Sequence, residues 1–479
     1  MFKVINDLLH NLPTGILITD KEQNVVFECD GLSAYRQIPL AVALPTNIEQ
    51  IKTILTICRK YNTPIVTRGA GTGLSGGALP LEKGILLVLS KFNKILSIDP
   101  LQRIAQVEVG VRNIQISQAA ASYNLYYAPD PSSQIACTIG GNVAENSGGV
   151  HCLKYGLTVN NVLAVKILTI EGELLEFNQY QEGIDLLALI NGSEGLLGII
   201  IEVTVKLLPK PPKAQLIMAG FADIVECANA VTNIIEQGII PAGLEMMDKF
   251  AIEAAEAFVK IGYPLDAEAL LLCELDGDET QVKIGIDKVS QILKAAQATS
   301  ITVSTNEKHR LDLWQGRKSA FPAIGRLSPD YYCMDGTIPR NRLAEVLAKM
   351  AELSEIYNLR VANVFHAGDG NLHPLILYDA NKEGELEKTE EFGQKILELC
   401  IEVGGTITGE HGVGVEKLDS MCTQFTAPEL ETFHGIKKAF DQQELLNPGK
   451  AVPTLNRCAE LGKMHVHNNQ LPFPELERF

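Results

Sequence analysis

The sequence lacks the cysteine spacing of a metal or iron–sulfur cluster. Its 479 residues include ten cysteines, and no two of them form a C-x-x-C pair. This excludes the usual thiolate runs that bind zinc or iron–sulfur clusters. A chain of this length does not need disulfides for stability, so we expect ten reduced thiols, as in cytosolic proteins. Buried structural cysteine is the common state, and a catalytic thiolate is the alternative for any one of them.

Positive charge and long apolar runs are also scarce. The chain has 41 Lys and Arg against 58 Asp and Glu, a formal charge of −17. This balance argues against a nucleic-acid partner and against electrostatic adhesion to an anionic membrane. No apolar run approaches the roughly 18 residues of a transmembrane helix. The first 20 residues carry no basic cluster and no small-residue cleavage site, so we expect a cytoplasmic protein without a secretory signal.

The composition and the order of apolar segments predict a globular, multidomain chain. Hydrophobic residues make up 46% and charged residues 21%, which is enough to build a core. Thr46 and Glu49 have the spacing of a capping box ahead of a helical pattern that runs through Cys58 and is ended by Asn62, Thr63 and Pro64. Short strands are expected at 64–67, 85–89, 104–109, 162–170 and 197–205.

A proline-rich segment divides the chain. Leu208–Lys213 has three prolines in four positions, which neither a helix interior nor a central strand accommodates. Beyond it, helical patterns alternate with strand patterns, so we expect an α+β second domain. The predicted helices are 224–237, 251–261, 280–298 and 343–357, and the predicted strands are 215–221, 269–275 and 358–365.

The run Arg68–Gly77 (RGAGTGLSGG) contains five glycines. Gly71-x-Gly73-x-x-Gly76 matches the dinucleotide fingerprint, but that motif requires a helix directly after it. Pro80 and an apolar strand follow instead, so we reject a Rossmann fold. Glycine-rich backbone can still form an anion-binding nest, which favours a phosphorylated cofactor. The alternative is a tight hairpin without a ligand.

A second block, Pro129–Gly149, is rich in small and hydroxyl-bearing residues. Such residues allow a flat ring to lie against the backbone. The alternative is an ordered loop that binds nothing.

Three histidines and a carboxylate form the third candidate site. His366 and His373 flank a Gly-Asp-Gly turn between two predicted strands, so a tight reversal would bring both rings together. Glu410 and His411 follow in a glycine-rich segment. Two imidazoles and one carboxylate suit a divalent metal such as zinc with one open position. Structural, hydrogen-bonded histidines are the alternative, and His411 is either a fourth ligand or a general base.

The two glycine-rich blocks resemble the FAD-binding domain of flavoenzymes of the vanillyl-alcohol oxidase type. The resemblance implies an α+β fold, with a two-subdomain FAD-binding domain and an α+β substrate (cap) domain. The segments it implies are an N-terminal segment (1–37), the FAD-binding domain (38–212), the cap domain (213–424), a C-terminal return (425–455) and an extended tail (456–479).

The same resemblance implies which residues contact FAD. The pyrophosphate would be bound by Arg68, Gly69, Ala70, Gly71, Thr72, Gly73, Gly76 and Gly77. The flavin half would contact Pro129, Ser132, Gly140, Gly141, Asn142, Asn146, Gly148 and Gly149. Glu194, Gly198 and Ile199 would lie near the adenosine end, and Asn447 in the return would close over the flavin. Some members attach FAD through a histidine in the first loop. This loop has none, so non-covalent FAD is expected, and His151 lies near the second loop.

The segments HAGDGNLH and GEHGVG resemble motifs of the FAD-linked 2-hydroxy acid dehydrogenases. That resemblance implies a divalent metal on His366, His373 and Glu410, and a base at His411. Arg317 would hold the substrate carboxylate, a role that suits the bidentate guanidinium fork. Without the resemblance, a surface ion pair is the alternative for this arginine.

The implied reaction is oxidation of glycolate to glyoxylate, with D-lactate or another D-2-hydroxy acid as the alternative substrate. Electrons would pass to a second flavin-binding-like subunit and an iron–sulfur subunit, which would bring the protein to the inner membrane. Two other readings stay open: a metal-dependent hydrolase built on the histidines, and a flavin-binding assembly subunit without turnover.

Overall fold

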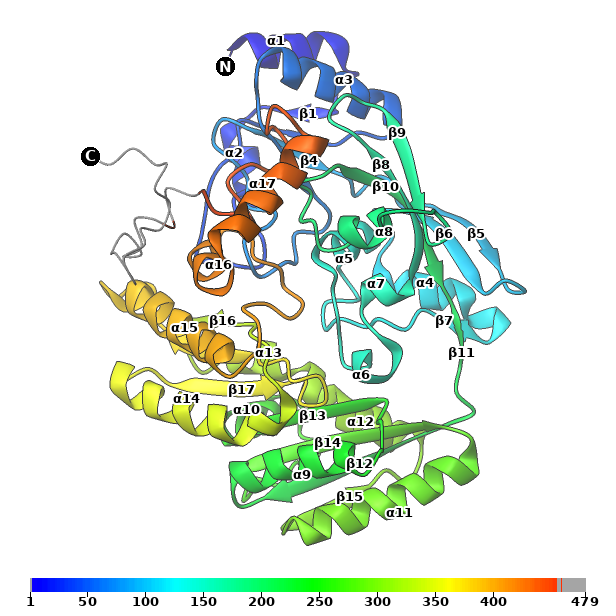
Figure 1. The fold of residues 1–479 in the computed structure, drawn as a ribbon, viewed down its shortest axis with the longest axis vertical. Helices are drawn as coiled ribbons and strands as arrows, with labels where there is room; N and C mark the ends of the chain where they lie inside the picture. Colours follow the sequence, from blue (N-terminus) through cyan, green and yellow to red (C-terminus); the bar gives the residue numbers. More distant parts are fainter. Residues whose placement is uncertain (1, 455–457, 459–479) are drawn as a thin grey trace.

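The computed structural model describes residues 2–454 and Cys458. An upper part is built on two larger sheets and a lower part on one, and the C-terminal helices return to the upper part (Figure 1). Apart from Cys458, the expected tail (456–479) lies outside the described residues. Among the described residues, no helix is long and apolar enough to cross a membrane.

The first sheet has the order β1-β2-β4-β3, with β2, β4 and β3 parallel and β1 antiparallel. Its elements are α1 (Phe2–Asn11), β1 (Leu17–Ile18), α2 (Lys21–Asn24), β2 (Ala41–Ala43), α3 (Ile48–Lys60), β3 (Ile65–Arg68) and β4 (Ile85–Val88). The predicted cap of α3 is wrong by one residue. Asn47 is the N-cap, because its side chain accepts the Gln50 amide at 3.0 Å. Gln50 in turn accepts the amide of Thr46 at 2.7 Å.

The second sheet is antiparallel, in the order β5-β6-β10-β8-β9. Its strands are β5 (Ile95–Asp99), β6 (Ile104–Glu108), β8 (Val162–Leu168), β9 (Leu174–Asn178) and β10 (Ile199–Lys206). Its helices are α4 (Asn113–Ala120), α5 (Ile139–Glu145), α6 (Cys152–Tyr155), α7 (Thr158–Asn161) and α8 (Leu186–Ile190). Both upper sheets share one hydrophobic core, as expected for a domain of two subdomains.

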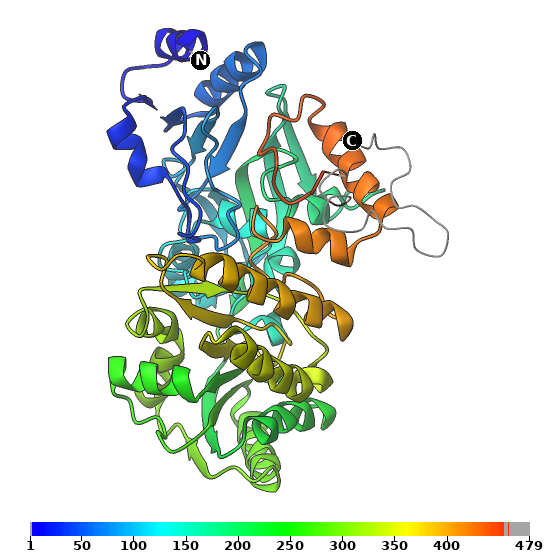
Figure 2. The ribbon, with the colours of Figure 1, turned by 90° about the vertical axis from the view of Figure 1, so that its left-hand side faces the viewer.

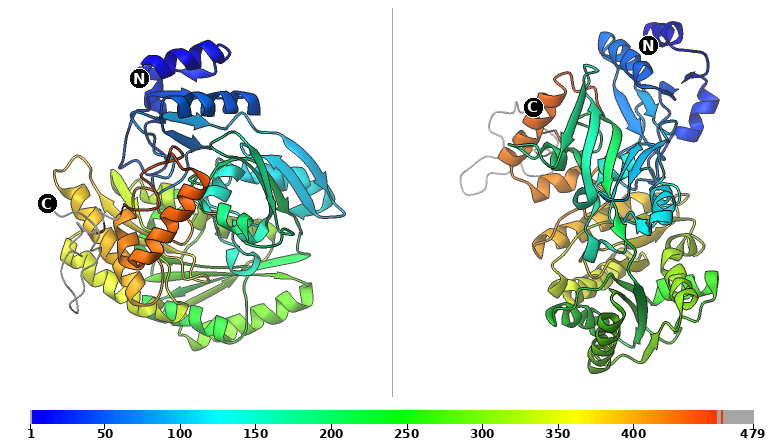
Figure 3. Two further views of the ribbon diagram at one scale, coloured as in Figure 1. Left: turned by 45° about the horizontal axis from the view of Figure 1, so that its top comes forward. Right: turned by 90° about the vertical axis from the view of Figure 1, so that its right-hand side faces the viewer.

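The lower part is a seven-stranded sheet in the order β15-β12-β14-β13-β17-β18-β16. The strands are β12 (Lys213–Phe221), β13 (Gly243–Asp248), β14 (Ala269–Gly277), β15 (Ser300–Val303), β16 (Asp330–Cys333), β17 (Val361–Phe365) and β18 (Pro374–Tyr378). Alternate residues of β12 pack into different hydrophobic cores. Ile217 and Ala219 belong to one core, and Leu216 and Met218 belong to the other. Helices therefore cover both faces (Figure 3).

Each face has its own set of helices. One is packed by α9 (Ile224–Glu236), α11 (Glu279–Ala295), α14 (Leu343–Tyr357) and α15 (Glu385–Glu402). The other is packed by α10 (Lys249–Val259), α12 (Glu307–Lys318) and α13 (Ala320–Ile324). The predicted alternation of helices and strands beyond residue 213 is confirmed.

The chain passes from the upper to the lower part at the proline-rich segment Leu208–Lys213. Leu208–Pro209 forms a two-residue strand, β11, against β7 (Leu125–Tyr126), and the chain then enters the lower part. After α15, α16 (Leu418–Gln424) and α17 (Ala427–Phe440) lie beside the upper part (Figure 2).

The expectation of ten free thiols is wrong for one pair, because Cys422 and Cys458 form a disulfide with Cα atoms 5.3 Å apart. Sequence spacing gives no sign of this pairing, since 36 residues separate the two.

Candidate active site

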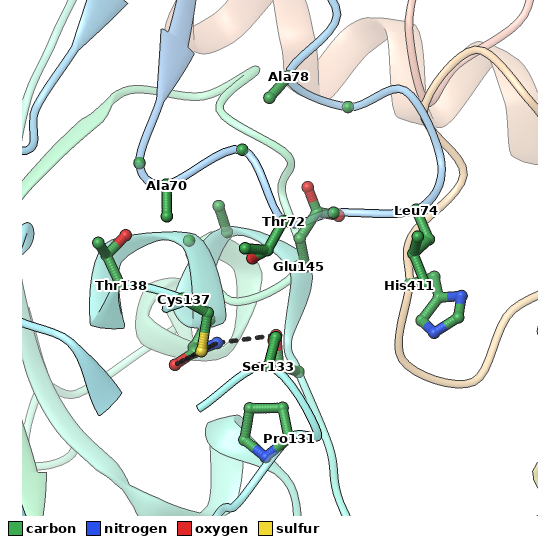
Figure 4. A pocket seen from close by; sticks show the side chains of 18 of the residues that line it. Ala70, Thr72, Leu74, Ala78, Pro131, Ser133, Cys137, Thr138, Glu145 and His411 are labelled. Atoms are coloured by element: carbon green, nitrogen blue, oxygen red, sulfur yellow. Dashed lines mark hydrogen bonds between the residues drawn. The ribbon is translucent and has the colours of Figure 1, made fainter. Parts of the chain in front are cut away.

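A cavity of about 480 Å³ lies where the upper and lower parts meet. Residues of both glycine-rich blocks and of the histidine cluster line it. Figure 4 shows side chains of the two blocks on one side of the cavity and His411 on the other. The predicted cofactor residues among its walls are Arg68, Gly69, Ala70, Gly71, Thr72, Gly73, Gly77, Ser132, Gly140, Gly141, Asn142, Glu194 and Gly198. All five predicted catalytic and metal residues also line it: Arg317, His366, His373, Glu410 and His411.

The remaining predicted cofactor residues are not among these walls: Gly76, Pro129, Asn146, Gly148, Gly149, Ile199 and Asn447. Several of them hold the lining segments in place. Asn447 Nδ2 donates to the carbonyls of Gly77 at 3.0 Å and Glu194 at 2.6 Å. Asn146 ends α5 in a left-handed conformation with a φ of 54°. Their contact with a cofactor stays a prediction.

The glycine loop Arg68–Gly77 follows β3, and all residues between it and β4 are described. No helix lies between them, so the rejection of a Rossmann fold is confirmed. Gly71 has a φ of +71°, which other residues rarely adopt. A Cβ at Gly69 would lie 2.2 Å from Thr138 Oγ1 of the second block. The two glycine-rich blocks therefore touch directly.

The second block is not all loop, because α5 occupies its middle. Thr138 precedes α5, and Thr67 lies in β3, next to its last residue. Both line the cavity, and both buried hydroxyls lack a hydrogen-bond partner within the protein. A buried hydroxyl without a partner is costly unless a ligand satisfies it. The walls thus fit a phosphorylated, flat cofactor.

His366 and His373 come together as the Gly-Asp-Gly reversal predicts. They follow β17 and precede β18, and their ring centroids are 5.0 Å apart. Both Nε2 atoms point at one carboxylate oxygen, Glu410 Oε1, at 3.3 Å from His366 and 2.9 Å from His373. The three ligand atoms lie within 4.8 Å of one another. This donor set fits a divalent cation with an open position.

A carboxylate behind the cluster orients the ring of His366. Glu245 Oε1 on β13 lies 2.8 Å from His366 Nδ1, the carboxylate–histidine arrangement common behind metal ligands. Burial opposes charge on His366, but the carboxylates of Glu245 and Glu410 raise its pKa to about 10. The surroundings of His366 are thus locally acidic and favour a positive charge at this place. A second group, Cys333, His373 and His411, is also close enough to share an ion, but burial raises the pKa of Cys333 and disfavours its thiolate.

His411 stacks on His373, with ring centroids 4.8 Å apart and planes inclined by 9°. Burial lowers its pKa to about 4, so the ring is neutral near pH 7. Its Nδ1 is buried without a hydrogen-bond partner. A neutral, unpaired imidazole in a cavity wall can accept a proton from a ligand.

Arg317, at the end of α12, is only 1% exposed although it carries a full charge. Its Nη2 lies 2.7 Å from Glu245 Oε2. Glu245 thus holds Nη2, whereas the buried Nε has no hydrogen-bond partner. The expected alternative of a surface ion pair is therefore wrong, and the guanidinium is placed to bind an anion in the cavity.

Two carboxylates fix the loop that carries Glu410 and His411, and sequence reasoning missed both roles. Asp335, after β16, accepts the amide of His411 at 2.9 Å and the hydroxyl of Thr408 at 2.6 Å. Glu194, from the upper part, accepts the amides of Val413 and Gly414, each at 2.7 Å. Both parts of the molecule thus hold this loop.

His151, which lies near the second block, is not a wall of the cavity. Its two ring nitrogens face Asp130 and Glu274 instead. Neither nitrogen is free to attach a cofactor, which favours non-covalent binding.

Two family models match the chain: the FAD binding domain over residues 39–178, and the C-terminal domain of FAD linked oxidases over residues 210–451. The chain is 61% identical to glycolate oxidase subunit GlcD of Escherichia coli K12, over 99% of this chain and 96% of that protein. It is 38% identical to GlcD of Bacillus subtilis, over 89% and 92%. It is 32% identical to a D-lactate dehydrogenase of Anaerostipes hadrus, over 91% and 94%.

Solved structures share the fold at low sequence identity. A substrate-bound p-cresol methylhydroxylase aligns with a TM-score of 0.80 and 16% identity, covering 95% of this chain and 97% of that chain. An alkyldihydroxyacetonephosphate synthase aligns with a TM-score of 0.74 and 17% identity, covering 94% and 86%.

Proposed function

This chain belongs to the FAD-linked oxidases, and from that premise we propose that it oxidises glycolate to glyoxylate with FAD as the electron acceptor. The high identity to glycolate oxidase subunits over nearly the whole chain favours glycolate, and the D-lactate dehydrogenases are more distant. One observation carries the proposal. A single cavity joins the glycine-rich walls to Arg317 and His411.

FAD would lie along the two glycine-rich blocks, with its phosphates against Arg68–Gly77 and its flavin toward the histidine cluster. When bound, it supplies the acceptor for the hydride. The chain's own contribution is orientation and electrostatics. Residues from both parts of the molecule would surround the substrate carbon that loses the hydride.

A divalent metal, with zinc as the first choice, would be held by His366, His373 and Glu410. When bound, it supplies a Lewis acid beside the α-hydroxyl. Glu245 would keep His366 in the tautomer whose Nε2 faces the ion.

The remaining steps belong to protein groups. Arg317 would bind the glycolate carboxylate through its guanidinium, whose Nε has no hydrogen-bond partner. His411 would take the hydroxyl proton, since its ring is neutral and lines the same cavity. Burial of both groups strengthens these contacts by keeping water out.

The name of the relatives supports a proposal about partners and location. GlcD is named a subunit, and the sequence has no C-x-x-C spacing. Electrons would therefore pass to a second flavin-binding-like subunit and to an iron–sulfur subunit. The protein would be cytoplasmic and reach the inner membrane through these partners.

Anaerobic flavin reduction tests the substrate. We expect glycolate to bleach the oxidised flavin of the purified protein faster than D-lactate, and L-lactate to be the slowest. Stopped-flow absorbance with each acid at several concentrations gives the rates. Faster reduction by D-lactate would favour the alternative dehydrogenase. Protein without FAD absorbance would favour a hydrolase, and bound flavin that no acid reduces would favour an assembly subunit.

Metal removal tests the histidine cluster. After dialysis against a chelator, we expect the protein to keep its FAD, because its predicted pyrophosphate loop lies outside the cluster. Flavin reduction by glycolate should fall by about 100-fold or more, since a Lewis acid contributes several kcal/mol. Added zinc should restore the rate, with one ion bound per chain by elemental analysis. Full activity in metal-free protein would contradict the metal site.

A further inference from the structure

His151 joins two carboxylates across the boundary between the upper and lower parts. Its Nδ1 lies 2.9 Å from Asp130 Oδ2, and its Nε2 lies 3.3 Å from Glu274 Oε1. Its backbone amide also donates to Asp130 Oδ1 at 3.2 Å. Asp130 belongs to the second glycine-rich block, whereas Glu274 lies on β14 of the lower sheet. The imidazole therefore bridges two parts of the molecule that both reach the cavity.

On the lower side, Glu274 is tied to the helix of the predicted substrate arginine. Its Oε2 accepts Arg310 Nη1 at 2.6 Å and also the Trp314 indole N–H. Both donors lie on α12, four residues apart and so on one face. The same helix ends at Arg317 and Lys318, which line the cavity. Glu274 thus fixes the position of α12 on the sheet.

On the upper side, Asp130 is tied to the wall expected to face the flavin. Pro131 and the residues after it line the cavity. Gly149 packs against Asp130: a Cβ there would lie 2.5 Å from the Asp130 carbonyl carbon. Asp130 Oδ2 also lies 3.6 Å from Lys318 Nζ. A shift of Asp130 would therefore move the second glycine-rich block relative to α12.

The charges make the bridge strong. Asp130 and Glu274 have side chains that are only 13% and 3% exposed. Burial opposes charge on His151, but these carboxylates raise its pKa to about 10. Loss of the imidazolium would leave Glu274 with Arg310 and Asp130 with Lys318 at 3.6 Å. Each buried carboxylate would lose one of its two positive partners, which is costly.

We propose that His151 is a positioning residue, an ionic clamp that sets the distance between the flavin wall and Arg317. This inference rests on the proposed oxidation of glycolate. It predicts a specific kinetic pattern. Arg317, His366 and His373 all belong to the lower part, so glycolate should still bind normally without the clamp. Only its distance from the flavin wall should change.

The test compares His151→Gln, which removes the charge, with His151→Arg, which keeps it. We expect His151→Gln to lower the rate constant of flavin reduction at saturating glycolate by about 10- to 100-fold, as misplacement near 1 Å does. The concentration of glycolate giving half-maximal rate and the FAD content should stay within about twofold of the unaltered protein. His151→Arg should recover most of the rate. A normal rate in His151→Gln would overturn the clamp.

Lys154→Met is the matched control, because Lys154 forms an ion pair with Asp276 across the same boundary, away from the cavity walls. We expect no change in its reduction rate. Equal losses in both variants would mean general loosening of the boundary and would overturn the proposal. Should His151→Gln lose FAD, Glu274→Gln breaks the same link from the lower side. The double variant should reduce its flavin no more slowly than the slower of the two single variants. Additive losses of rate would contradict a shared clamp.

Hydrogen exchange separates this proposal from the proposed function. If glycolate does not reduce the flavin of the unaltered protein, the proposed function is wrong. The clamp still predicts a difference in amide exchange rates between the two variants. Amides of α12 and of the residues after Asp130 should exchange faster in His151→Gln than in Lys154→Met. Unchanged exchange in both segments would overturn the clamp.

Discussion

Replacing His411 with alanine is expected to slow flavin reduction by glycolate about 10²- to 10⁴-fold while leaving FAD bound. That range is typical for loss of a general base. The ring is neutral, lines the cavity and stacks on His373. Alanine keeps the backbone amide that donates to Asp335 at 2.9 Å, so the loop should keep its shape. Anaerobic stopped-flow reduction and the flavin-to-protein ratio are the measurements.

His434→Ala is a suitable control for this substitution. His434 is a half-buried histidine of α17 whose Nε2 contacts the Pro453 carbonyl at 2.9 Å, and it does not line the cavity. It should reduce its flavin at the normal rate. Added imidazole should restore part of the rate to His411→Ala, because a free base can enter the space left by the ring. A normal rate in His411→Ala would show that another group takes the proton.

Features encoded in short stretches of sequence could be predicted. The glycine run after β3 and the proline after it gave the loop and excluded a following helix. The reversal between His366 and His373 also depends on adjacent residues, and the structure closes it with a hydrogen bond from the His366 amide to the Asn371 carbonyl at 3.0 Å. In both cases backbone conformation is set locally, so a single sequence is sufficient.

Residues that act through distant partners could not be predicted. Asp335 contacts the Glu410 amide from 75 positions away, and Glu245 contacts His366 from 121 positions away. Each is one acidic residue among 58, in or beside an apolar strand that carries no motif. The same holds for the disulfide of Cys422 and Cys458. The role of these residues comes from the packing of the two parts, which no local pattern encodes.

Asp335→Asn is expected to destabilise the protein by about 2–4 kcal/mol and to slow flavin reduction about 10- to 100-fold. Asp335 is fully buried, and one of its oxygens accepts from the His411 amide, the Thr408 hydroxyl and Lys417 Nζ at 2.6–3.2 Å. Whichever side-chain atom becomes the NH₂ group would confront donors. Buried Lys417 would also lose a counter-charge, and the loop of Glu410 and His411 would lose its anchor.

Asp335 also predicts the sign of a pH effect. Burial opposes its ionisation, but Lys417 and the nearby histidines lower its pKa below the ordinary 3.8. An acid whose pKa is lower in the folded than in the unfolded state stabilises the fold. This stabilisation is complete above the unfolded-state pKa and is lost as pH falls toward the folded-state pKa. The stability difference between the unaltered protein and Asp335→Asn should therefore be full above about pH 4 and shrink below it.

Denaturant unfolding across this pH range, with flavin reduction at neutral pH, tests both effects. Asp223→Asn is the control, because Asp223 caps α9 from an exposed position and its side chain accepts the Val225 amide at 2.7 Å. It should cost about 1 kcal/mol or less and leave flavin reduction unchanged. If Asp335→Asn lost stability but kept its reduction rate, Asp335 would only hold the fold together. Loss of both links this buried carboxylate to the placement of His411, because the same hydrogen bonds that stabilise the loop also fix the position of its imidazole.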